Sequence, residues 1–218
     1  MSVQEFALQV TKKQRPARPQ PICFDFRPFN FTLIENQNPP FHADLRHIYM
    51  LYAAAKFLPR HAKIVEVGSF RGASTAAFIQ VLNERPDLTL DCYDISITPE
   101  LHRVREMCIN PERVTLHQKY LPEDLRLGRN DMIFIDGDNG MSAFRDLLIA
   151  AINNPLCIAM HDTEGYYNAL GSTNAACILL CAKNRRAVLD SQKRDGELTQ
   201  RGIIFSARHE AWEKEYFF

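Results

Sequence analysis

The chain has 218 residues, and its 26 lysines and arginines are balanced by 26 aspartates and glutamates, so the formal net charge is zero. This length is enough to bury the core of one domain without disulfides or structural metal, and the balanced charge provides no field for collecting nucleic acid or an anionic membrane. The six cysteines show no zinc-type CxxC pairs, so we expect reduced, mostly buried thiols.

The first 41 residues differ in composition from the rest of the chain. They hold six of the 12 prolines and show no sustained periodicity, which predicts an irregular arm over 1–41 before a single domain over 42–218. The stretch FDFRPFNF at 24–31 is too apolar to remain in water, so we expect it to pack on the body of the protein or on a second subunit, which leaves a homodimer open. No secretory signal or run of membrane-spanning length is present, so we expect a cytoplasmic protein without a membrane partner.

Apolar residues at helical spacing between 43 and 58, stopped by Pro59, predict the first helix of the domain. After this helix, signals for strands and helices alternate along the chain. Strands are expected at 63–67, 88–94, 113–117, 131–136 and 156–160, and again at 187–191 and 202–207. Helices are expected at 73–83, from 99 onward, at 141–152 and at 170–182.

The apolar runs are short and continuous rather than alternating, as is typical of parallel strands that are covered on both faces. The order of elements therefore predicts a doubly wound α/β sheet. Only the polar stretch at 192–201 separates the last two strands, which is too little for a helical crossover, so we expect the last strand to be antiparallel.

The segment IVEVGSFRGAST, at 64–75, joins the first strand to the following helix. Open α/β sheets bind ligands beyond the carboxyl ends of their strands, where this first join usually lies. Gly68 and Gly72 allow a tight turn and the close approach of a ligand, while Ser74 and the first helical amides can hold a carboxylate or phosphate. The pattern E-x-G-x-x-x-G-x-S differs from the GxGxxG of dinucleotide sites and places Glu66 at the strand end.

A second acid, Asp94, ends the second expected strand, 26 residues after Gly68. An acid at this place can accept both hydroxyls of a ribose. Taken alone, Glu66 or Asp94 is also consistent with a helix cap or a surface charge. Together, at these spacings, they favour a ligand that carries both an α-amino acid and a ribose over one that carries a pyrophosphate.

From Ala43 to Ala207 the chain resembles a class I S-adenosylmethionine-dependent methyltransferase, whose Rossmann-like sheet has seven strands with the last one antiparallel. The resemblance implies that Asp94 holds the ribose of S-adenosylmethionine. It also implies that the methionine part is surrounded by Glu66, Gly68, Ser69, Gly72 and Ser74.

Two later motifs, FIDGDNG at 134–140 and AMHDT at 159–163, resemble a narrower group of small O-methyltransferases, many acting on sugars or natural products and related to catechol O-methyltransferase. In that group, acids after the fourth and fifth strands bind a divalent metal, which implies a Mg²⁺ site at Asp136, His161 and Asp162. His161 is a softer ligand and is alternatively the catalytic base. In the other interpretation, Asp136 contacts only the cofactor amine, and His161 with Asp162 caps the next loop.

The chain departs from the pattern of this group in two places. Asn139 stands where the common D-G-D-H motif has a histidine, which is the proposed base in some sugar methyltransferases, and asparagine takes no proton at neutral pH. Lys119 and Tyr120 stand where relatives commonly have a small residue and an acid, so the adenine pocket is not carried over. Tyr120 is equally consistent with stacking on adenine and with an exposed loop.

The resemblance thus implies methyl transfer from S-adenosylmethionine to a hydroxyl of a small polar molecule, assisted by metal if the acidic cluster binds Mg²⁺. The alternative is a non-catalytic cofactor-binding or assembly protein, because the usual base is missing. An NAD-dependent oxidoreductase is disfavoured by the absence of GxGxxG. Methylation of a nucleic acid is disfavoured by the zero net charge and by DGDN in place of an N/D-P-P-Y/F motif.

Overall fold

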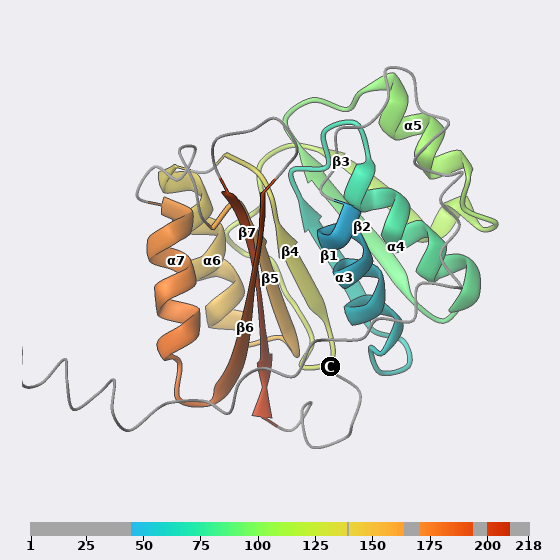
Figure 1. The fold of residues 1–218 in the computed structure, drawn as a ribbon. Helices are drawn as coiled ribbons and strands as arrows, with labels where there is room; N and C mark the ends of the chain where they lie inside the picture. Colours follow the sequence, from blue (N-terminus) through green and yellow to red (C-terminus); the bar gives the residue numbers. More distant parts are fainter. Residues whose placement is uncertain (1–44, 139, 164–170, 194–199, 210–218) are drawn as a thin grey trace, which may run out of the picture.

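A seven-stranded sheet runs through the molecule, and helices cover both of its faces (Figure 1). The computed structural model describes residues 45–138, 140–163, 171–193 and 200–209. The expected arm over 1–41, with its aromatic stretch, and Asn139 lie outside these described residues. The strands are β1 (Lys63–Val67), β2 (Thr89–Asp94), β3 (Val114–Gln118), β4 (Met132–Ile135), β5 (Cys157–His161), β6 (Arg185–Lys193) and β7 (Gln200–Arg208).

The strand order is β3-β2-β1-β4-β5-β7-β6. Strands β1 to β5 pair in parallel, whereas β7 lies between β5 and β6 and is antiparallel to both. The predicted doubly wound, seven-stranded Rossmann-like sheet with an antiparallel last strand is therefore confirmed. The order changes direction at β1, which has β2 on one side and β4 on the other.

The helices divide between the two faces of the sheet (Figure 1). Ile64 of β1 belongs to the apolar core under α3 and α4, and Val65 belongs to the core under α6 and α7. Successive side chains of a strand point to opposite faces, so one continuous apolar run supplies both cores. The first face carries α3 (Leu45–Lys56), α4 (Ala73–Glu84) and α5 (Pro99–Glu106), and the second carries α6 (Met141–Asn153) and α7 (Gly171–Cys181).

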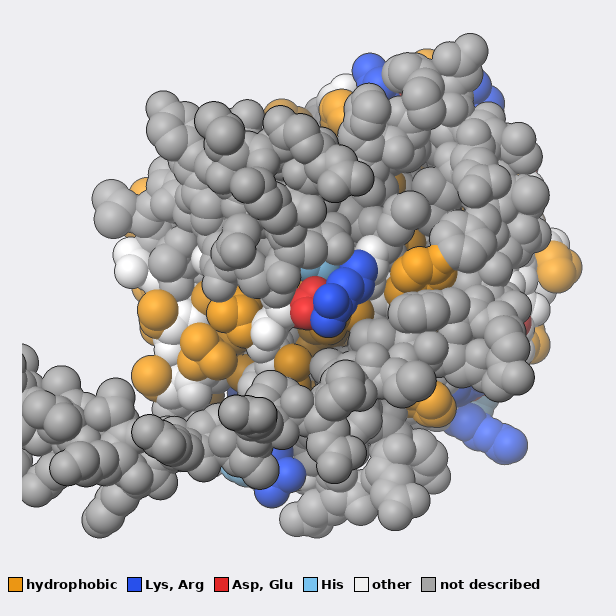
Figure 2. Space-filling model, in the orientation of Figure 1, with side chains coloured by type: hydrophobic (Ala, Val, Ile, Leu, Met, Phe, Trp, Pro, Cys, Tyr) orange, Lys and Arg blue, Asp and Glu red, His pale blue; other side chains and the backbone are white. Residues whose placement is uncertain are grey.

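Some apolar side chains of the second helical layer remain exposed. They include Ile152 of α6 and Ile178 and Leu180 of α7, and Figure 2 shows hydrophobic side chains gathered where α7 lies. None of the described helices is long and apolar enough to cross a membrane.

The five cysteines among the described residues are free thiols. Three of them, Cys92, Cys108 and Cys157, are buried, in keeping with the expectation of mostly buried thiols, whereas Cys177 and Cys181 are exposed. They lie four residues apart on α7, where this spacing puts both on one side of a helix. That side of α7 is turned away from the sheet.

Candidate functional site

A cavity of ≈ 690 Å³ opens at the carboxyl ends of β1, β2, β3 and β4. It lies where the strand order changes direction, which is the place where open α/β sheets bind ligands. The described residues that line it lie at or just beyond the ends of these strands, or on α6: Val67, Gly68, Phe70, Tyr93, Asp94, Ile95, Lys119, Tyr120, Leu121, Asp136, Gly137, Asp138, Ser142 and Asp146.

Two glycines shape the turn between β1 and α4, for different reasons. Gly68 has a φ of +84°, and a Cβ added to it would lie 2.2 Å from the backbone oxygen of Asp136. Gly72 has a φ of +91°, and its added Cβ would lie 3.1 Å from Val104 Cγ2 and 3.2 Å from Leu101 Cδ1. Gly68 therefore lets the turn lie directly against the end of β4, and Gly72 lets α5 pack on the start of α4. Of the two, Gly68 lines the cavity.

Glu66 is fully buried behind this turn. Its carboxylate accepts hydrogen bonds from Ser74 Oγ at 2.5 Å, Thr75 Oγ1 at 2.6 Å, Ser69 Oγ at 3.1 Å and Cys92 Sγ at 3.3 Å. Burial raises the pKa of Glu66, and these hydrogen bonds oppose that rise. None of the five residues is among the described residues that line the cavity. The structure therefore places Glu66, Ser69 and Ser74 in a polar cluster that ties the turn to the first turn of α4.

Asp94 lies at the end of β2 and lines the cavity. The backbone N–H of Phe70 donates to its Oδ2 at 2.8 Å, and the backbone N–H of Ser96 donates to its Oδ1 at 2.9 Å. These two hydrogen bonds fix the orientation of the carboxylate, and each oxygen keeps a further lone pair. Asp94 can thus still accept hydrogen bonds from ligand hydroxyls.

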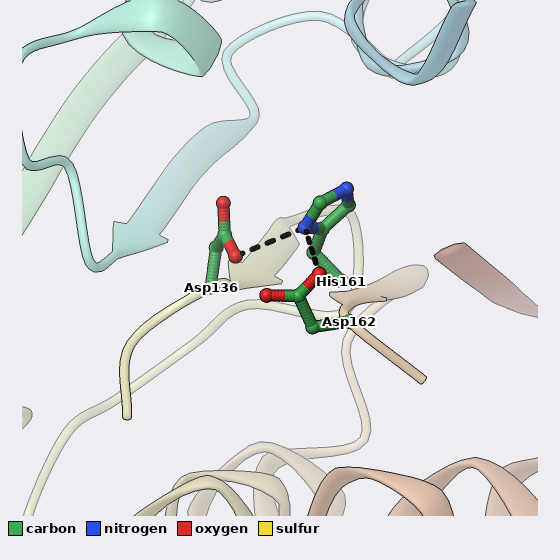
Figure 3. Close-up of side chains that lie close together, drawn as sticks. All are labelled: Asp136, His161 and Asp162. Carbon is green, nitrogen blue, oxygen red and sulfur yellow. Dashed lines mark ion pairs between the residues drawn. The ribbon is translucent and has the colours of Figure 1, made fainter. Parts of the chain in front are cut away.

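Asp136, His161 and Asp162 come together at the ends of β4 and β5 (Figure 3). Ile135 pairs with Met160, so the residues that follow them lie side by side. Nδ1 of His161 is 3.2 Å from Asp136 Oδ1 and 3.3 Å from Asp162 Oδ1. Asp162 has a φ of 51°, in the left-handed region that aspartate tolerates better than most residues.

The other ring nitrogen of His161 contacts a residue from a distant part of the chain. Nε2 of His161 lies 2.9 Å from Nδ1 of His47, on α3. Nε2 of His47 lies 3.5 Å from Asp190 Oδ2, on β6, and Asp190 also pairs with Arg46 at 2.7 Å. Both histidines are buried, with His47 only 1% exposed. Both nitrogens of His161 are therefore engaged by protein groups.

The ligand set of this cluster suits a divalent cation. One ligand atom from each of Asp136, His161 and Asp162 lies within 4.8 Å of the others. Carboxylates are the ligands that Mg²⁺ and Mn²⁺ prefer, and an imidazole is also accepted by transition metals. Asp136 lines the cavity as well, so a cation held here would lie at the edge of the cavity.

Among the side chains that line the cavity and that sequence reasoning missed are Phe70, Asp138 and Asp146. Phe70 is 62% exposed at the turn after β1. Asp146 of α6 is buried, and this burial raises its pKa to about 6 against the attraction of Arg145. Asp146 could have been noticed in the sequence, because it is an acid on the otherwise apolar face of the helix expected at 141–152. Tyr120, which the sequence left undecided, lines the cavity and is 68% exposed.

No protein-family model matches the chain, and comparison with curated proteins finds no match. Several solved structures are similar in fold. A protein of Klebsiella pneumoniae, provisionally assigned as an O-methyltransferase, has a TM-score of 0.62 and 17% identity, over 94% of this chain and 96% of that one. An O-methyltransferase from Bacillus cereus, in complex with SAH, has a TM-score of 0.62 and 14% identity, over 94% and 97% of the two chains. The O-methyltransferase TomG from Streptomyces achromogenes, involved in tomaymycin synthesis and solved with SAM, has a TM-score of 0.60 and 12% identity, over 95% and 99%.

Proposed function

We propose that this chain, which has the fold of the class I S-adenosylmethionine-dependent methyltransferases, methylates a hydroxyl of a small polar molecule. The observation that carries the proposal is that Asp94, Gly68 and Asp136 line the same cavity. Asp136 also belongs to the acidic cluster with His161 and Asp162. A volume of ≈ 690 Å³ is within the range of small-molecule sites. The balanced charge and this cavity favour a small molecule over a nucleic acid.

Within this proposal the residues around the turn have two kinds of role. Asp94 accepts the ribose hydroxyls, because its carboxylate is oriented by backbone N–H groups and faces the cavity. Gly68 leaves the turn open toward the methionine part of S-adenosylmethionine. Glu66, with Ser69 and Ser74, acts indirectly by holding the shape of the turn.

S-adenosylmethionine, when bound, would supply its sulfonium-bound methyl group. The acceptor oxygen would form a bond to the methyl carbon in line as the sulfonium–methyl bond breaks, so that S-adenosylhomocysteine leaves and the hydroxyl proton passes to water. The protein contributes mainly orientation, because holding the two reactants in an attack geometry removes much of the entropic part of the barrier. The cavity provides a place for this, since Asp94 and Asp136 both line it and come from the ends of the two strands that flank β1. No covalent intermediate with the protein is needed.

A divalent metal such as Mg²⁺, held by Asp136, His161 and Asp162, would lower the pKa of the acceptor hydroxyl. The proposed role of His161 is that of a ligand rather than a general base. Its Nδ1 faces two carboxylates and its Nε2 contacts His47, so neither nitrogen is turned to an acceptor in the cavity. This assignment also reduces the need for a histidine at the position of Asn139.

The acceptor class is proposed as a sugar or a natural product. TomG, which shares the fold, is involved in tomaymycin synthesis. A screen for the acceptor should therefore include glycosides and hydroxylated aromatic compounds.

Calorimetric titration of the protein with S-adenosylhomocysteine tests the first part of the proposal. We expect binding in the micromolar range. Asp94→Asn should weaken it by about 10-fold or more, because it removes a charged acceptor of hydrogen bonds. Asp91→Asn is the matched control on the same strand, since Asp91 pairs with Lys63 away from the cavity. Absence of binding at millimolar ligand would contradict the proposal.

An acceptor screen that measures release of S-adenosylhomocysteine, with and without Mg²⁺, tests the second part. A methyltransferase should turn over with at least one hydroxyl acceptor. Binding of the cofactor without turnover on any acceptor class would instead support the non-catalytic alternative.

A further inference from the structure

We propose that His47 is a positioning residue for the metal site, and that with Asp190 it fixes the tautomer of His161 that presents Nδ1 to a divalent cation. The inference deepens the proposed function and rests on its metal-assisted form. The observation that motivates it is a line of contacts from β6 through α3 to the end of β5, which the acidic cluster alone does not require.

The line of contacts has a definite order. Asp190 Oδ2 lies 3.5 Å from Nε2 of His47, and Nδ1 of His47 lies 2.9 Å from Nε2 of His161. Nδ1 of His161 then faces Asp136 and Asp162 (Figure 3). The two imidazole rings meet edge to face, with centroids 5.0 Å apart and an interplanar angle of 79°. Within this arrangement, the 2.9 Å distance between Nδ1 of His47 and Nε2 of His161 brings the two ring nitrogens together.

Each contact determines where the next proton resides. A neutral histidine carries one ring proton, and a nitrogen that binds a metal must be unprotonated. If Nδ1 of His161 is to bind a cation, its proton must be on Nε2, where it donates to Nδ1 of His47. His47 must then carry its own proton on Nε2, facing the carboxylate of Asp190. The negative charge of Asp190 therefore favours, through His47, the metal-binding tautomer of His161.

The environment supports a specific role over simple packing. His47 is 1% exposed and His161 is 8% exposed, and burying polar ring nitrogens is unfavourable unless they find partners. Arg46 pairs with the other oxygen of Asp190 at 2.7 Å and holds this carboxylate beside His47. Partners of metal-binding histidines typically change metal affinity by about 10- to 100-fold when they are removed.

The test measures Mn²⁺ binding to the full chain in two ways. Calorimetry gives the affinity, and pulsed EPR detects nitrogen coupling from a coordinated imidazole. His47→Phe keeps a buried ring but removes both nitrogens, so we expect a loss of Mn²⁺ affinity of about 10- to 100-fold and a weakened nitrogen coupling. His47→Asn places an amide oxygen near the former Nδ1 and should restore part of both. Asp190→Asn should cause a smaller loss with the coupling retained.

The matched control is His117→Phe. His117 also lies beside an aspartate, since its Nε2 is 3.5 Å from Oδ1 of Asp91. His117 is on β3, away from the acidic cluster, so Mn²⁺ binding should not change. Titration with S-adenosylhomocysteine on the same samples checks folding and cofactor binding. If His47→Phe does not fold, Asp190→Asn replaces it as the test variant.

Wild-type Mn²⁺ affinity and coupling in His47→Phe would overturn the inference while leaving the metal site intact. Absence of Mn²⁺ binding by the wild-type protein would overturn both the positioning role of His47 and the metal site. The titration with S-adenosylhomocysteine would then test the methyltransferase proposal separately.

Discussion

At the scale of single residues, Glu66 shows how a motif acid can act through structure. Its buried carboxylate is the common acceptor for Ser69, Ser74, Thr75 and Cys92. Glu66→Ala would leave these donors without their acceptor, so we expect a loss of about 2–4 kcal/mol in the free energy of unfolding, measured in urea. Glu66→Gln keeps one carbonyl acceptor and should cost less. Equal stability of Glu66→Ala and wild type would show that the cluster does not hold the turn.

A second residue-scale prediction concerns Asp146, whose pKa is raised to about 6 because it is buried. Between its ordinary pKa and this value the folded state binds more protons than the unfolded state, so the free energy of unfolding falls as the pH rises. We expect Asp146→Asn to become more stable relative to wild type by up to about 3 kcal/mol between pH 4 and pH 7. Urea unfolding across this range measures the difference. Asp124→Asn, on an exposed residue, is the control, and a flat difference for Asp146→Asn would contradict the prediction.

At the scale of elements, the β1–α4 turn and the end of β4 depend on each other through Gly68. Gly68→Ala combines a φ of +84° with a Cβ only 2.2 Å from the backbone of Asp136, so the turn must move away from β4. We expect a loss of more than about 2 kcal/mol in the free energy of unfolding, together with weaker binding of S-adenosylhomocysteine. Gly137→Ala is the matched control for stability, because its added Cβ would lie 3.7 Å from Val67 Cγ1, an ordinary contact distance. Similar behaviour of the two variants would show that the close approach is not limiting.

Most elements could be predicted from the sequence because their signals are local. Continuous apolar runs marked the strands, and the order of elements indicated that Asp136 and His161 follow adjacent strand ends. The partners of His161 could not be found in this way. His47 lies among apolar residues at helical spacing, where it resembles a core residue, and Asp190 lies on a strand 143 residues later in the chain. Which helical side chain crosses to which strand depends on how the layers pack, and spacing does not encode it.

At the scale of the whole molecule, the residues proposed to bind the cofactor and the acidic cluster proposed to bind a metal lie at one edge of the sheet but on different strands. Asp94 is the last residue of β2, whereas Asp136 follows β4, and His161 with Asp162 lies at the end of β5. The two functions should therefore be separable. We expect a chelator to abolish turnover while binding of S-adenosylhomocysteine stays nearly intact, because Asp94 and the glycine turn do not depend on the metal.

Asp162→Ala should behave like the chelator, since Asp162 is a proposed metal ligand and is not among the described residues that line the cavity. Turnover on the acceptor found by the screen, and calorimetry with S-adenosylhomocysteine, measure the two functions on the same preparation. Asp91→Ala is the control, because Asp91 lies within β2 and pairs with Lys63, so both functions should persist. Full turnover in excess chelator would contradict metal assistance. In that case a carboxylate inside the cavity would be the next candidate for the base that removes the proton. Asp138 lines the cavity and is exposed, so a variant of Asp138 would be the first to test.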